Sequence, residues 1–367
     1  MRIAWVVAGG VDESGVERVT PSLLWQIERL ARRHEVHVYV LRYHHRPRTY
    51  QLLGATVHDL GRPEGILRQY AATLDAIRRD RRPAVLHGML ALPAGVVAAA
   101  IGRRLGVPSM VTCDSGEFVG IDDIGYGAQA SVRQRWAVRV MCRLASRIIV
   151  CTDYQARLAA ARGVRTVLLP IGVDTSRFQP PAAPPPEGPP WRLLQVASLN
   201  RVKDQQTLLA AFARLHAAGV DARLTIAGED TLGGSIQHEA TRLGIAEHIT
   251  FRGPVPSASL AALYQGAHLF VMSSRHEGGP VVALEAAASG LPIVGTAVGY
   301  VADWAGERAI AVPPHAPTLL ADRIASLIAD PSRRRRLAAS ARDWVLRHDA
   351  DWTAGEHDRL YQELAAA

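Results

Sequence analysis

The residues best suited to chemistry lie in one short segment of the second half of the chain. It reads Ser274-Arg275-His276-Glu277-Gly278-Gly279-Pro280-Val281, and a helix of small residues is expected to follow it. Glycines let a ligand approach the backbone closely, and proline suits a first helical position, where no amide proton is needed. The free N–H groups of that first turn, with the positive end of the helix dipole, favour an anion. The segment therefore predicts phosphate binding around Gly278, Gly279, Pro280 and Val281.

Two glutamates, Glu277 and Glu285, flank this turn at a spacing of eight positions. Glu277 precedes the expected helix, so its carboxylate can reach a ligand. Glu285 lies inside the helix, where burying a carboxylate is costly unless hydroxyl or cationic donors meet it. Ribose hydroxyls would satisfy it, and so would a neighbouring arginine. The alternative is that Glu277 is a surface acid and Glu285 an ordinary exposed helix residue.

Lys203 is the only lysine among 42 basic residues. A chain that uses arginine everywhere else places a compact point charge here, and lysine is a common phosphate ligand. Arg201 is a second candidate for positive charge in the same segment. The alternative is that Lys203 is a chance surface residue at a helix start.

The pattern Glu277-x7-Glu285, followed by Ala-x3-Gly-x-Pro, resembles the signature of the family 4 glycosyltransferases, which are retaining enzymes of the GT-B fold. Other segments resemble the same family, loosely in the first half and specifically in the second: Gly9-Gly10 with Gly15-Val16-Glu17-Arg18, Leu169-Pro170-Ile171-Gly172-Val173-Asp174, Val196-Ala197-Ser198-Leu199-Asn200-Arg201-Val202-Lys203, Leu224-Thr225-Ile226-Ala227-Gly228 and Phe251-Arg252-Gly253. The resemblance covers nearly the whole chain. One departure is Ser198, where the family often has an arginine.

The resemblance implies transfer of a sugar, with retention, from a nucleotide-activated donor to an acceptor hydroxyl. The pathways implied are the biosynthesis of cell-surface polysaccharide, glycolipid or glycoconjugate. It gives Glu277 contact with the sugar hydroxyls, Glu285 contact with the ribose, and Lys203 contact with the leaving diphosphate. The expected donor-binding residues are Asn200, Arg201, Gly253, Gly278, Gly279, Pro280, Val281 and Glu285. Residues 191–345, the expected donor-binding domain, contain no Asp-x-Asp, so neither a metal nor another cofactor is expected.

The acceptor side departs from the family pattern. The family commonly carries a histidine after the strand that matches residues 109–112, and this chain has Asp114 in that place, with Glu117 close by. We expect Asp114 to accept a hydrogen bond from a sugar or acceptor hydroxyl, as a third catalytic candidate beside Glu277 and Lys203. It could equally be a turn-forming aspartate. Gly10 and Glu117 are the expected acceptor-binding residues.

Both halves alternate short β-branched runs with amphipathic stretches. Strands are expected at residues 3–8, 35–41, 84–87, 109–112 and 147–151, and then at 192–197, 223–227, 249–252, 269–273 and 292–296. Near-continuous apolar strands that alternate with helices indicate parallel sheets covered on both faces. We therefore predict two doubly wound, Rossmann-like α/β domains that face each other across a ligand-binding cleft. A capping box at Ser14 and Glu17 predicts the start of the first helix.

The expected domains are residues 1–178 for the acceptor and 191–345 for the nucleotide-sugar. They are joined by a stiff proline-rich linker at 179–190, and a C-terminal helix at 346–367 is expected to return to the first domain. The chain has 367 residues, of which three are cysteines, so a disulfide framework is excluded. The start of the chain has an apolar run too short for a signal peptide, and Pro93 and glycines interrupt the uncharged stretch 83–102. A cytoplasmic protein is therefore expected.

Charge is unevenly divided between the halves. Residues 1–178 hold 25 arginines against 15 acidic residues, whereas residues 179–367 hold 17 basic against 19 acidic residues. The basic half is consistent with an anionic or lipid-linked acceptor, and no nucleic acid partner is expected. A basic amphipathic helix is predicted where Arg133, Arg135, Arg139, Arg143 and Arg147 are interleaved with Trp136, Val140, Met141 and Leu144. Peripheral contact with the inner membrane surface is one interpretation, and a solvated arginine face is the other.

Three rival functions follow from the same features. One is a nucleotide-sugar epimerase or hydrolase on the same two-domain plan. Another is a catalytically silent subunit that binds nucleotide-sugar and supports a partner, which the Asp114 substitution keeps open. A dinucleotide oxidoreductase is disfavoured because Gly9-Gly10 is not a G-x-G-x-x-G fingerprint.

Overall fold

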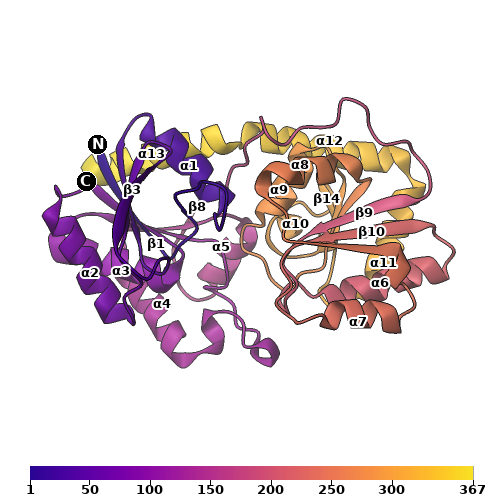
Figure 1. Cartoon of the computed structure of the whole chain (residues 1–367), viewed down its shortest axis with the longest axis horizontal. Coiled ribbons are helices and arrows are strands. Elements are labelled where there is room, and N and C mark those ends of the chain that lie inside the picture. The colour runs from indigo at the N-terminus through magenta and orange to yellow at the C-terminus, as the bar shows by residue number, and fades with distance from the viewer. Residues whose placement is uncertain (367) are drawn as a thin grey trace. The chain divides into compact units, whose positions relative to one another are not determined.

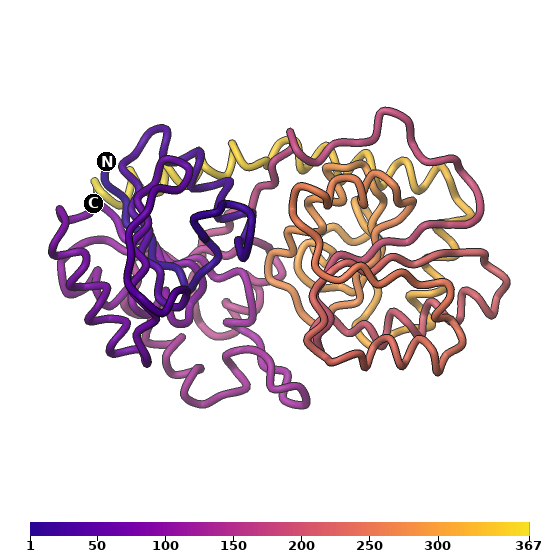
Figure 2. Tube along the Cα trace, viewed as in Figure 1, coloured from indigo at the N-terminus to yellow at the C-terminus, as the bar shows by residue number. Residues whose placement is uncertain are grey.

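The chain folds into two α/β units, each built around its own sheet (Figure 1). The computed structural model describes residues 1–366. Residues 1–172 and the C-terminal helix α13 (Ala350–Ala366) form the first unit. The second unit is Val173–Asp349. Figure 2 follows the chain, coloured yellow at its end, back to the unit that holds its N-terminus.

The sheet of the first unit has eight strands in the order β3-β4-β2-β1-β5-β6-β7-β8. The strands are β1 (Arg2–Val7), β2 (Glu35–Val40), β3 (Arg48–Leu52), β4 (Ala55–Asp59), β5 (Val85–Met89), β6 (Ser109–Cys113), β7 (Arg147–Val150) and β8 (Val167–Leu168). Every pairing is parallel except that of β3 with β4. The central strands are buried on both faces, as apolar parallel strands require.

Helices cover the faces of this first sheet. They are α1 (Pro21–Ala31), α2 (Ile66–Arg79), α3 (Val96–Leu105), α4 (Val132–Leu144), α5 (Asp153–Ala160) and α13, with short helical turns η1 (Ala91–Gly95), η2 (Asp122–Ile124) and η3 (Ala128–Ala130). Helix α13 joins this core through Tyr361, whose hydroxyl accepts a 3.0 Å bond from Trp5 Nε1 and lies 2.6 Å from His87 Nδ1. The end of the chain is thus part of the first unit's core.

The sheet of the second unit has six strands in the order β11-β10-β9-β12-β13-β14, and all its pairings are parallel. The strands are β9 (Trp191–Val196), β10 (Ala222–Ala227), β11 (Ile249–Gly253), β12 (Leu269–Met272), β13 (Ile293–Thr296) and β14 (Ala309–Val312). The helices are α6 (Gln205–Ala217), α7 (Ser235–Arg242), η4 (Ala246–His248), α8 (Ser257–Gly266), α9 (Val281–Ala288), α10 (Gly299–Asp303), α11 (Pro317–Ala329) and α12 (Pro331–Arg347).

The expected parallel α/β architecture is confirmed, with local differences. The strands β3, β4, β8 and β14 were not predicted from the sequence. Helix α1 begins at Pro21 rather than at the Ser14 capping box, although the Ser14 hydroxyl does accept the Glu17 amide at 3.0 Å. Gly15 and Arg18 have positive φ angles of 66° and 49°, which end that turn before a helix can form. Pro280 precedes α9 as its N-cap instead of occupying its first position.

The boundaries and the basic helix also differ in detail. The first unit ends at Gly172, and the proline-rich residues 180–190 form no helix or strand and belong to the second unit. The helix α4 ends at Leu144, so Arg147 lies in β7 and not on the predicted basic helix. Within α4, Met141 is buried, whereas Trp136 is exposed. Among the described residues, no helix is both long enough and apolar enough to cross a bilayer.

Candidate active site

The second unit brings its chemistry-bearing loops together at one edge of its sheet. Strands β9 and β12 are neighbours at the centre, and the chain runs outward from β9 to β11 on one side and from β12 to β14 on the other. This is the topological switch point, where loops after adjacent strands diverge and open sheets bind ligands. The loop after β9 carries Asn200, Arg201 and Lys203, and the loop after β12 carries Glu277 and the two glycines.

Lys203 and Glu277 form an ion pair between these two loops. Nζ of Lys203 lies 2.6 Å from Oε1 of Glu277, and the side chains are 24% and 11% exposed. The Ser274 hydroxyl also donates to Oε1 of Glu277, at 2.6 Å. Two residues separated by more than seventy positions are thus brought together, and Glu277 is not an isolated surface acid.

Buried hydrogen bonds fix the position of Lys203. The Ser273 hydroxyl accepts a bond from Gln195 Nε2 at 3.0 Å and donates to the Lys203 carbonyl at 2.8 Å. The Arg275 amide donates to the Val202 carbonyl at 2.7 Å, which joins the two loops through their backbones. These hydrogen bonds hold the two loops in fixed positions, and so they fix the positions of Lys203 and Glu277.

Asn200 and Arg201 have different places in the first of these loops. Oδ1 of Asn200 accepts the amides of Val202 and Lys203 at 3.1 and 3.0 Å, so this side chain closes the turn that presents Lys203. The Arg201 side chain is exposed to solvent. Arg201 is therefore accessible to a ligand, while Asn200 acts on the loop itself.

The turn before α9 has the form of an anion site. Gly278 and Gly279 lead into Pro280, and the first amides of the helix, at Val281 and Val282, precede any intrahelical acceptor. Gly299 packs against this turn: a Cβ on Gly299 would stand 2.6 Å from Cδ of Pro280 and 3.1 Å from both the Gly278 carbonyl oxygen and Cβ of Glu277. Gly299 was not predicted from the sequence, because its only signal is a glycine at the start of a later helix.

Glu285 is buried, not exposed. It retains 3% exposure, and its Oε2 accepts a 2.7 Å hydrogen bond from the hydroxyl of Tyr264 on α8. Burial raises the pKa of Glu285 to about 7, and the Tyr264 hydrogen bond opposes part of that rise. Tyr264 thus supplies one of the hydrogen-bond donors that the buried carboxylate needs. This tyrosine was not predicted from the sequence.

Gly253 ends β11 at the same edge of the sheet. It has a φ angle of +63°, and its carbonyl accepts the Gly228 amide at 2.8 Å. A Cβ at Gly253 would meet no atom within 4 Å, so the space beside it is open. The positive φ, and not crowding, is what favours glycine at this position.

Asp114 lines a cavity of about 290 Å³ in the first unit. The cavity lies over the ends of β1, β5, β6 and β7, and Met89, Leu90 and Ile149 contribute to its largely apolar wall. Burial, and then the charge of Glu117, raise the pKa of Asp114 to about 7. A carboxylate with such a pKa can change its protonation state near neutral pH.

The two predicted acceptor-binding residues do not line this cavity. The Glu117 carboxylate is buried and accepts the amides of Ser115 at 2.9 Å and of Ala91 at 3.4 Å. Gly10 has a φ angle of +83°, and its carbonyl accepts the Thr20 amide at 2.9 Å. Ser115 and Thr20 do line the cavity, so Glu117 and Gly10 position its wall.

His357 of α13 is a cavity residue that sequence analysis missed. It is 5% exposed, and neither of its ring nitrogens makes a hydrogen bond of normal geometry, although the Thr353 backbone is near enough to favour the protonated ring. Burial lowers its pKa to about 4, so the ring is neutral. A neutral imidazole in a cavity can donate to or accept from a ligand hydroxyl. Its position late in the chain gave no spacing signal.

One group of side chains in the described residues has the spacing of metal ligands, and it lies elsewhere. His37, His58 and Asp80 offer ligand atoms within 4.8 Å of one another. Nη2 of Arg2 lies 2.9 Å from Nε2 of His37 and 3.6 Å from Oδ2 of Asp80, so a cationic side chain already occupies their surroundings. These three residues belong neither to the loops around Lys203 and Glu277 nor to the cavity that Asp114 lines.

Comparison with known proteins identifies the family. Residues 14–172 match the model of the "Glycosyl transferase 4-like domain", and residues 178–344 match that of "Glycosyl transferases group 1". The D-inositol 3-phosphate glycosyltransferase 1 of Catenulispora acidiphila is 32% identical over 290 residues, which are 73% of this chain and 68% of that protein. The chain belongs to the group 1 glycosyltransferases. It is a retaining glycosyltransferase of family 4 and uses a nucleotide-activated sugar donor.

Other relatives agree with this group 1 assignment. The glycogen synthase of Mycobacterium tuberculosis is 29% identical over 282 residues, covering 75% of this chain and 67% of that protein. The sucrose-phosphate synthase of Thermosynechococcus elongatus has a TM-score of 0.81 at 20% identity, with full coverage of both chains. The Anabaena protein HepE, in complex with UDP and glucose, has a TM-score of 0.76 at 16% identity, covering 99% of this chain and 100% of that one. These two structures show that this glycosyltransferase has the GT-B fold.

Proposed function

We propose that the second unit binds the nucleoside diphosphate of the donor at the Lys203–Glu277 pair and the N-terminus of α9. The observation that carries this proposal is the 2.6 Å contact of the chain's only lysine with Glu277, beside the free amides of Val281 and Val282. Lys203, Arg201 and these amides neutralise charge as it develops on the leaving diphosphate. When the diphosphate forms an ion pair with Lys203, the Glu277 carboxylate is released and contacts the sugar hydroxyls.

The nucleoside lies beside Gly253 and Glu285 in this proposal. The space next to Gly253 is open. The Glu285 carboxylate can accept a hydrogen bond from a hydroxyl group, as its bond from Tyr264 shows. Gly278, Gly279 and Pro280 shape the phosphate turn, and Asn200 holds Lys203 in place. The solved complex of HepE contains UDP and glucose, which supports a nucleoside diphosphate as the ligand.

The acceptor binds in the cavity of the first unit, with its reacting hydroxyl at Asp114. The apolar wall favours an acceptor that carries an apolar group, such as the lipid of a lipid-linked sugar. The reaction then serves glycolipid, cell-surface polysaccharide or glycoconjugate biosynthesis in the cytoplasm, where the three free cysteines are stable. His357 supplies a second polar contact, and Glu117 and Gly10 position the cavity wall.

A donor panel tests the proposal. Purified protein is mixed with individual nucleotide-sugars and melted, because a ligand that binds only the folded state raises the melting temperature. The stabilising donor is then incubated with alkyl glycosides and lipid-linked sugars, and the products are analysed by mass spectrometry. A new glycoside with the donor's anomeric configuration supports glycosyl transfer. Free sugar, an epimerised donor, or binding without turnover would instead support one of the rival functions.

A further inference from the structure

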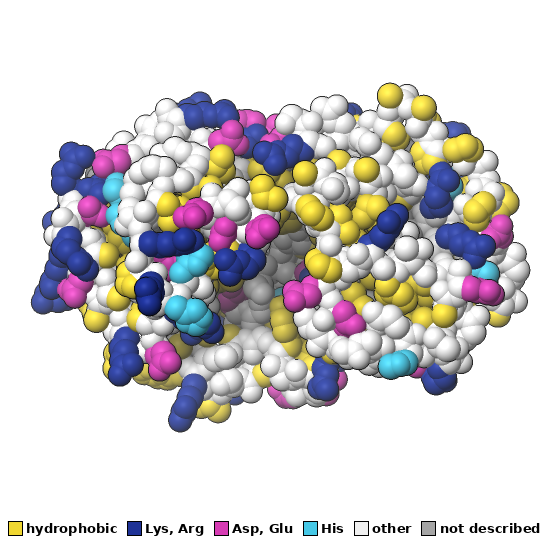
Figure 3. All heavy atoms as spheres, in the orientation of Figure 1, with side chains coloured by type: hydrophobic (Ala, Val, Ile, Leu, Met, Phe, Trp, Pro, Cys, Tyr) yellow, Lys and Arg dark blue, Asp and Glu magenta, His cyan; other side chains and the backbone are white. Residues whose placement is uncertain are grey.

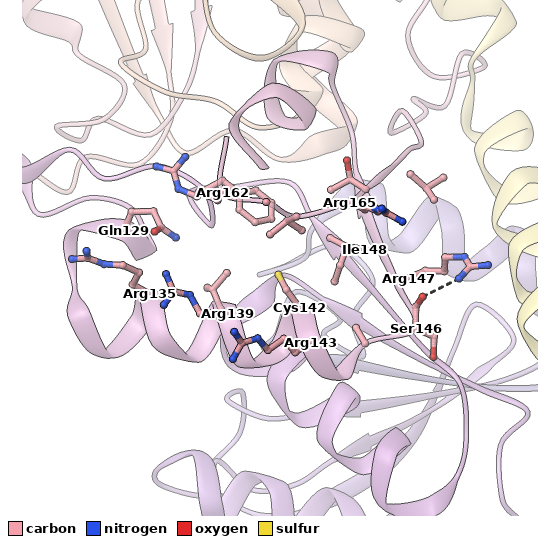
Figure 4. Close-up of a pocket in the computed structure, with 17 residues that line it drawn as sticks. Gln129, Arg135, Arg139, Cys142, Arg143, Ser146, Arg147, Ile148, Arg162 and Arg165 are labelled. Atoms are coloured by element: carbon pink, nitrogen blue, oxygen red, sulfur yellow. Dashed lines mark hydrogen bonds between the residues drawn. The ribbon is translucent and has the colours of Figure 1, made fainter. Parts of the chain in front are cut away.

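An open groove on the first unit is lined by arginine. It has a volume of about 520 Å³ and is formed by α4, the start of β7 and the segment between α5 and β8 (Figure 4). Six exposed arginines line it, and no acidic residue does: Arg135, Arg139, Arg143, Arg147, Arg162 and Arg165. This concentration of one charge accounts for much of the excess of arginine in the first half of the chain.

No acidic side chain in the groove neutralises the charge of these six arginines. None of them forms an ion pair with any residue of the described part of the chain, and Arg147 and Arg162 donate to the backbone carbonyls of Ser146 and Leu158. Some arginines elsewhere do form ion pairs, such as Arg29 with Asp351 and Arg359 with Glu356. Figure 3 shows basic and acidic side chains interspersed over the face that it presents. Unpaired like charges repel one another and so do not stabilise the fold. The cluster is therefore suited to binding an anion.

The arrangement of the side chains suits phosphate groups. Figure 4 shows Arg135, Arg139 and Arg143 along one helix, with Arg162 on the opposite side and Cys142 and Ile148 between. Guanidinium groups bind phosphate oxygens bidentately, with a geometry that lysine lacks. Several phosphates spaced along the groove can therefore be bound at once.

Two exposed apolar side chains extend the groove along α4. Val132 and Trp136 are 75% and 66% exposed, and both precede Arg139 and Arg143 on this helix. Because residues at i, i+4, i+7 and i+11 share a helix face, Val132, Trp136, Arg139 and Arg143 form one stripe. Tryptophan is favoured at the headgroup level of a bilayer. Phosphate ligands beside an exposed tryptophan match a lipid surface better than they match a soluble polyanion.

We propose that the groove and the exposed stripe of α4 dock the first unit on an anionic phospholipid membrane. The six arginines bind lipid phosphates, while Trp136 and Val132 enter the headgroup layer. This surface is separate from the residues to which the transferase function is assigned, so it can be tested without an acceptor. It explains how an enzyme without a membrane-spanning helix in its described residues would work at a bilayer.

Vesicle sedimentation with the full chain tests the proposal. The probes are vesicles of phosphatidylcholine alone and vesicles that also contain phosphatidylglycerol, at low and high salt. We expect binding only to the anionic vesicles, and its loss at high salt because salt screens surface charges. Since each basic residue near a surface contributes about a fivefold factor in binding, the double variant R139E/R143E should bind at least about 25-fold more weakly. The control R335E/R336E changes the net charge equally on exposed residues of α12 in the second unit.

A second pair of variants tests the apolar part. Trp136→Ala should weaken binding severalfold at constant charge, whereas Leu67→Ala, which removes an 80% exposed side chain from α2, should not. Thermal melting shows that each variant is folded. The proposal is overturned by equal binding to both vesicle types, by no binding to either, or by wild-type binding in R139E/R143E. It is also overturned if heparin binds as tightly as the vesicles and Trp136→Ala changes nothing, because the groove would then serve a soluble polyanion.

Discussion

Nζ of Lys203 and Oε1 of Glu277 are 2.6 Å apart, and they join the loops that follow the two central strands of the second sheet. Lys203, the cation that we assign to the diphosphate, is partly neutralised by Glu277, the carboxylate that we assign to the sugar. Donor binding must therefore exchange one partner of Lys203 for another. This exchange gives the two residues opposite effects on the binding of nucleotide alone.

Removing either charge should abolish most of the turnover. We expect Lys203→Ala to lower kcat/KM for the donor by roughly 10²–10³-fold, the usual cost of losing one group that stabilises transition-state charge. Lys203→Arg should not restore it, because a planar fork cannot replace a compact ammonium in a 2.6 Å contact. Glu277→Gln should lower kcat similarly while binding the nucleoside diphosphate more tightly, since Lys203 is then no longer neutralised.

Titration calorimetry with the nucleoside diphosphate separates this exchange from a purely structural role. Lys203→Ala should weaken its binding and Glu277→Gln should strengthen it. Arg335→Ala, an exposed arginine on α12, serves as the control and should change neither constant. If both active-site variants weaken nucleotide binding equally, the ion pair only holds the loops together.

Tyr264 and Glu285 should be coupled in stability. Tyr264→Phe removes the 2.7 Å hydrogen bond to a buried carboxylate, and we expect the free energy of unfolding to fall by about 1–3 kcal/mol. The pKa of Glu285, about 7, lies above its usual value of 4.5. The folded state therefore prefers the protonated form, and the free energy of unfolding falls as pH rises from about 4.5 to about 7. Glu285→Gln should lessen this fall in urea titrations; an unchanged pH dependence would contradict the assigned environment.

The lack of a side chain at Gly299 should be required for the position of the Gly278–Pro280 turn, which we assign to the donor phosphate. In Gly299→Ala, the new Cβ would stand 2.6 Å from Cδ of Pro280 at a φ angle of +52°. We expect the turn to move, with an increase in KM for the donor and a loss of about 1–3 kcal/mol in the free energy of unfolding. Gly306→Ala is the matched control, because Gly306 has a φ of +82° and open space around it. It should lower stability without changing KM, and a similar KM increase in both variants would count against the contact.

The sequence predicted the parts of the fold that are governed by local pattern. The central strands, such as β1 and β12, are continuous apolar runs because both faces of a parallel sheet are covered. The strands β3 and β4 were missed because each mixes exposed or partly exposed polar residues into five positions at one edge. The start of α1 was misplaced because Ser14 caps only an isolated turn, which positive φ angles at Gly15 and Arg18 end.

The candidate site was predictable where its signals are contiguous. The glycine turn and its two glutamates lie within one segment, and Lys203 is distinguished by its residue type. Tyr264, Gly299 and His357 were missed because each reaches its place through tertiary packing from a distant element, with no spacing that marks it. Asp114 was found only as a departure from a family pattern, and Glu117 was assigned to the ligand although it binds backbone amides.

The value of kcat/KM for the acceptor should depend on pH through the ionisation of Asp114. Burial first, and the charge of Glu117 second, raise the pKa of Asp114 from 3.8 to about 7. If the ionised form accepts the hydrogen bond of the acceptor hydroxyl, kcat/KM for the acceptor should rise with pH up to about 7 and then level off. Over the interval from about pH 4 to 7 the free energy of unfolding should fall, because the folded state holds this proton more tightly than the unfolded chain does.

Substitution of Glu117 tests whether Asp114, and not another group that titrates near neutral pH, causes this pH dependence. Glu117→Gln removes one of the two causes of the shift while keeping an oxygen for the Ser115 amide, so the rising limb should move to lower pH. Asp114→Asn should remove the limb and most of the activity, and Asp122→Asn, at an exposed acid in the same loop region, should leave it in place. A limb that stays at the same pH in Glu117→Gln would show that Asp114 is not the titrating group. Asp114 would then be a turn-forming residue, and the acceptor hydroxyl would have to be held by other groups such as His357.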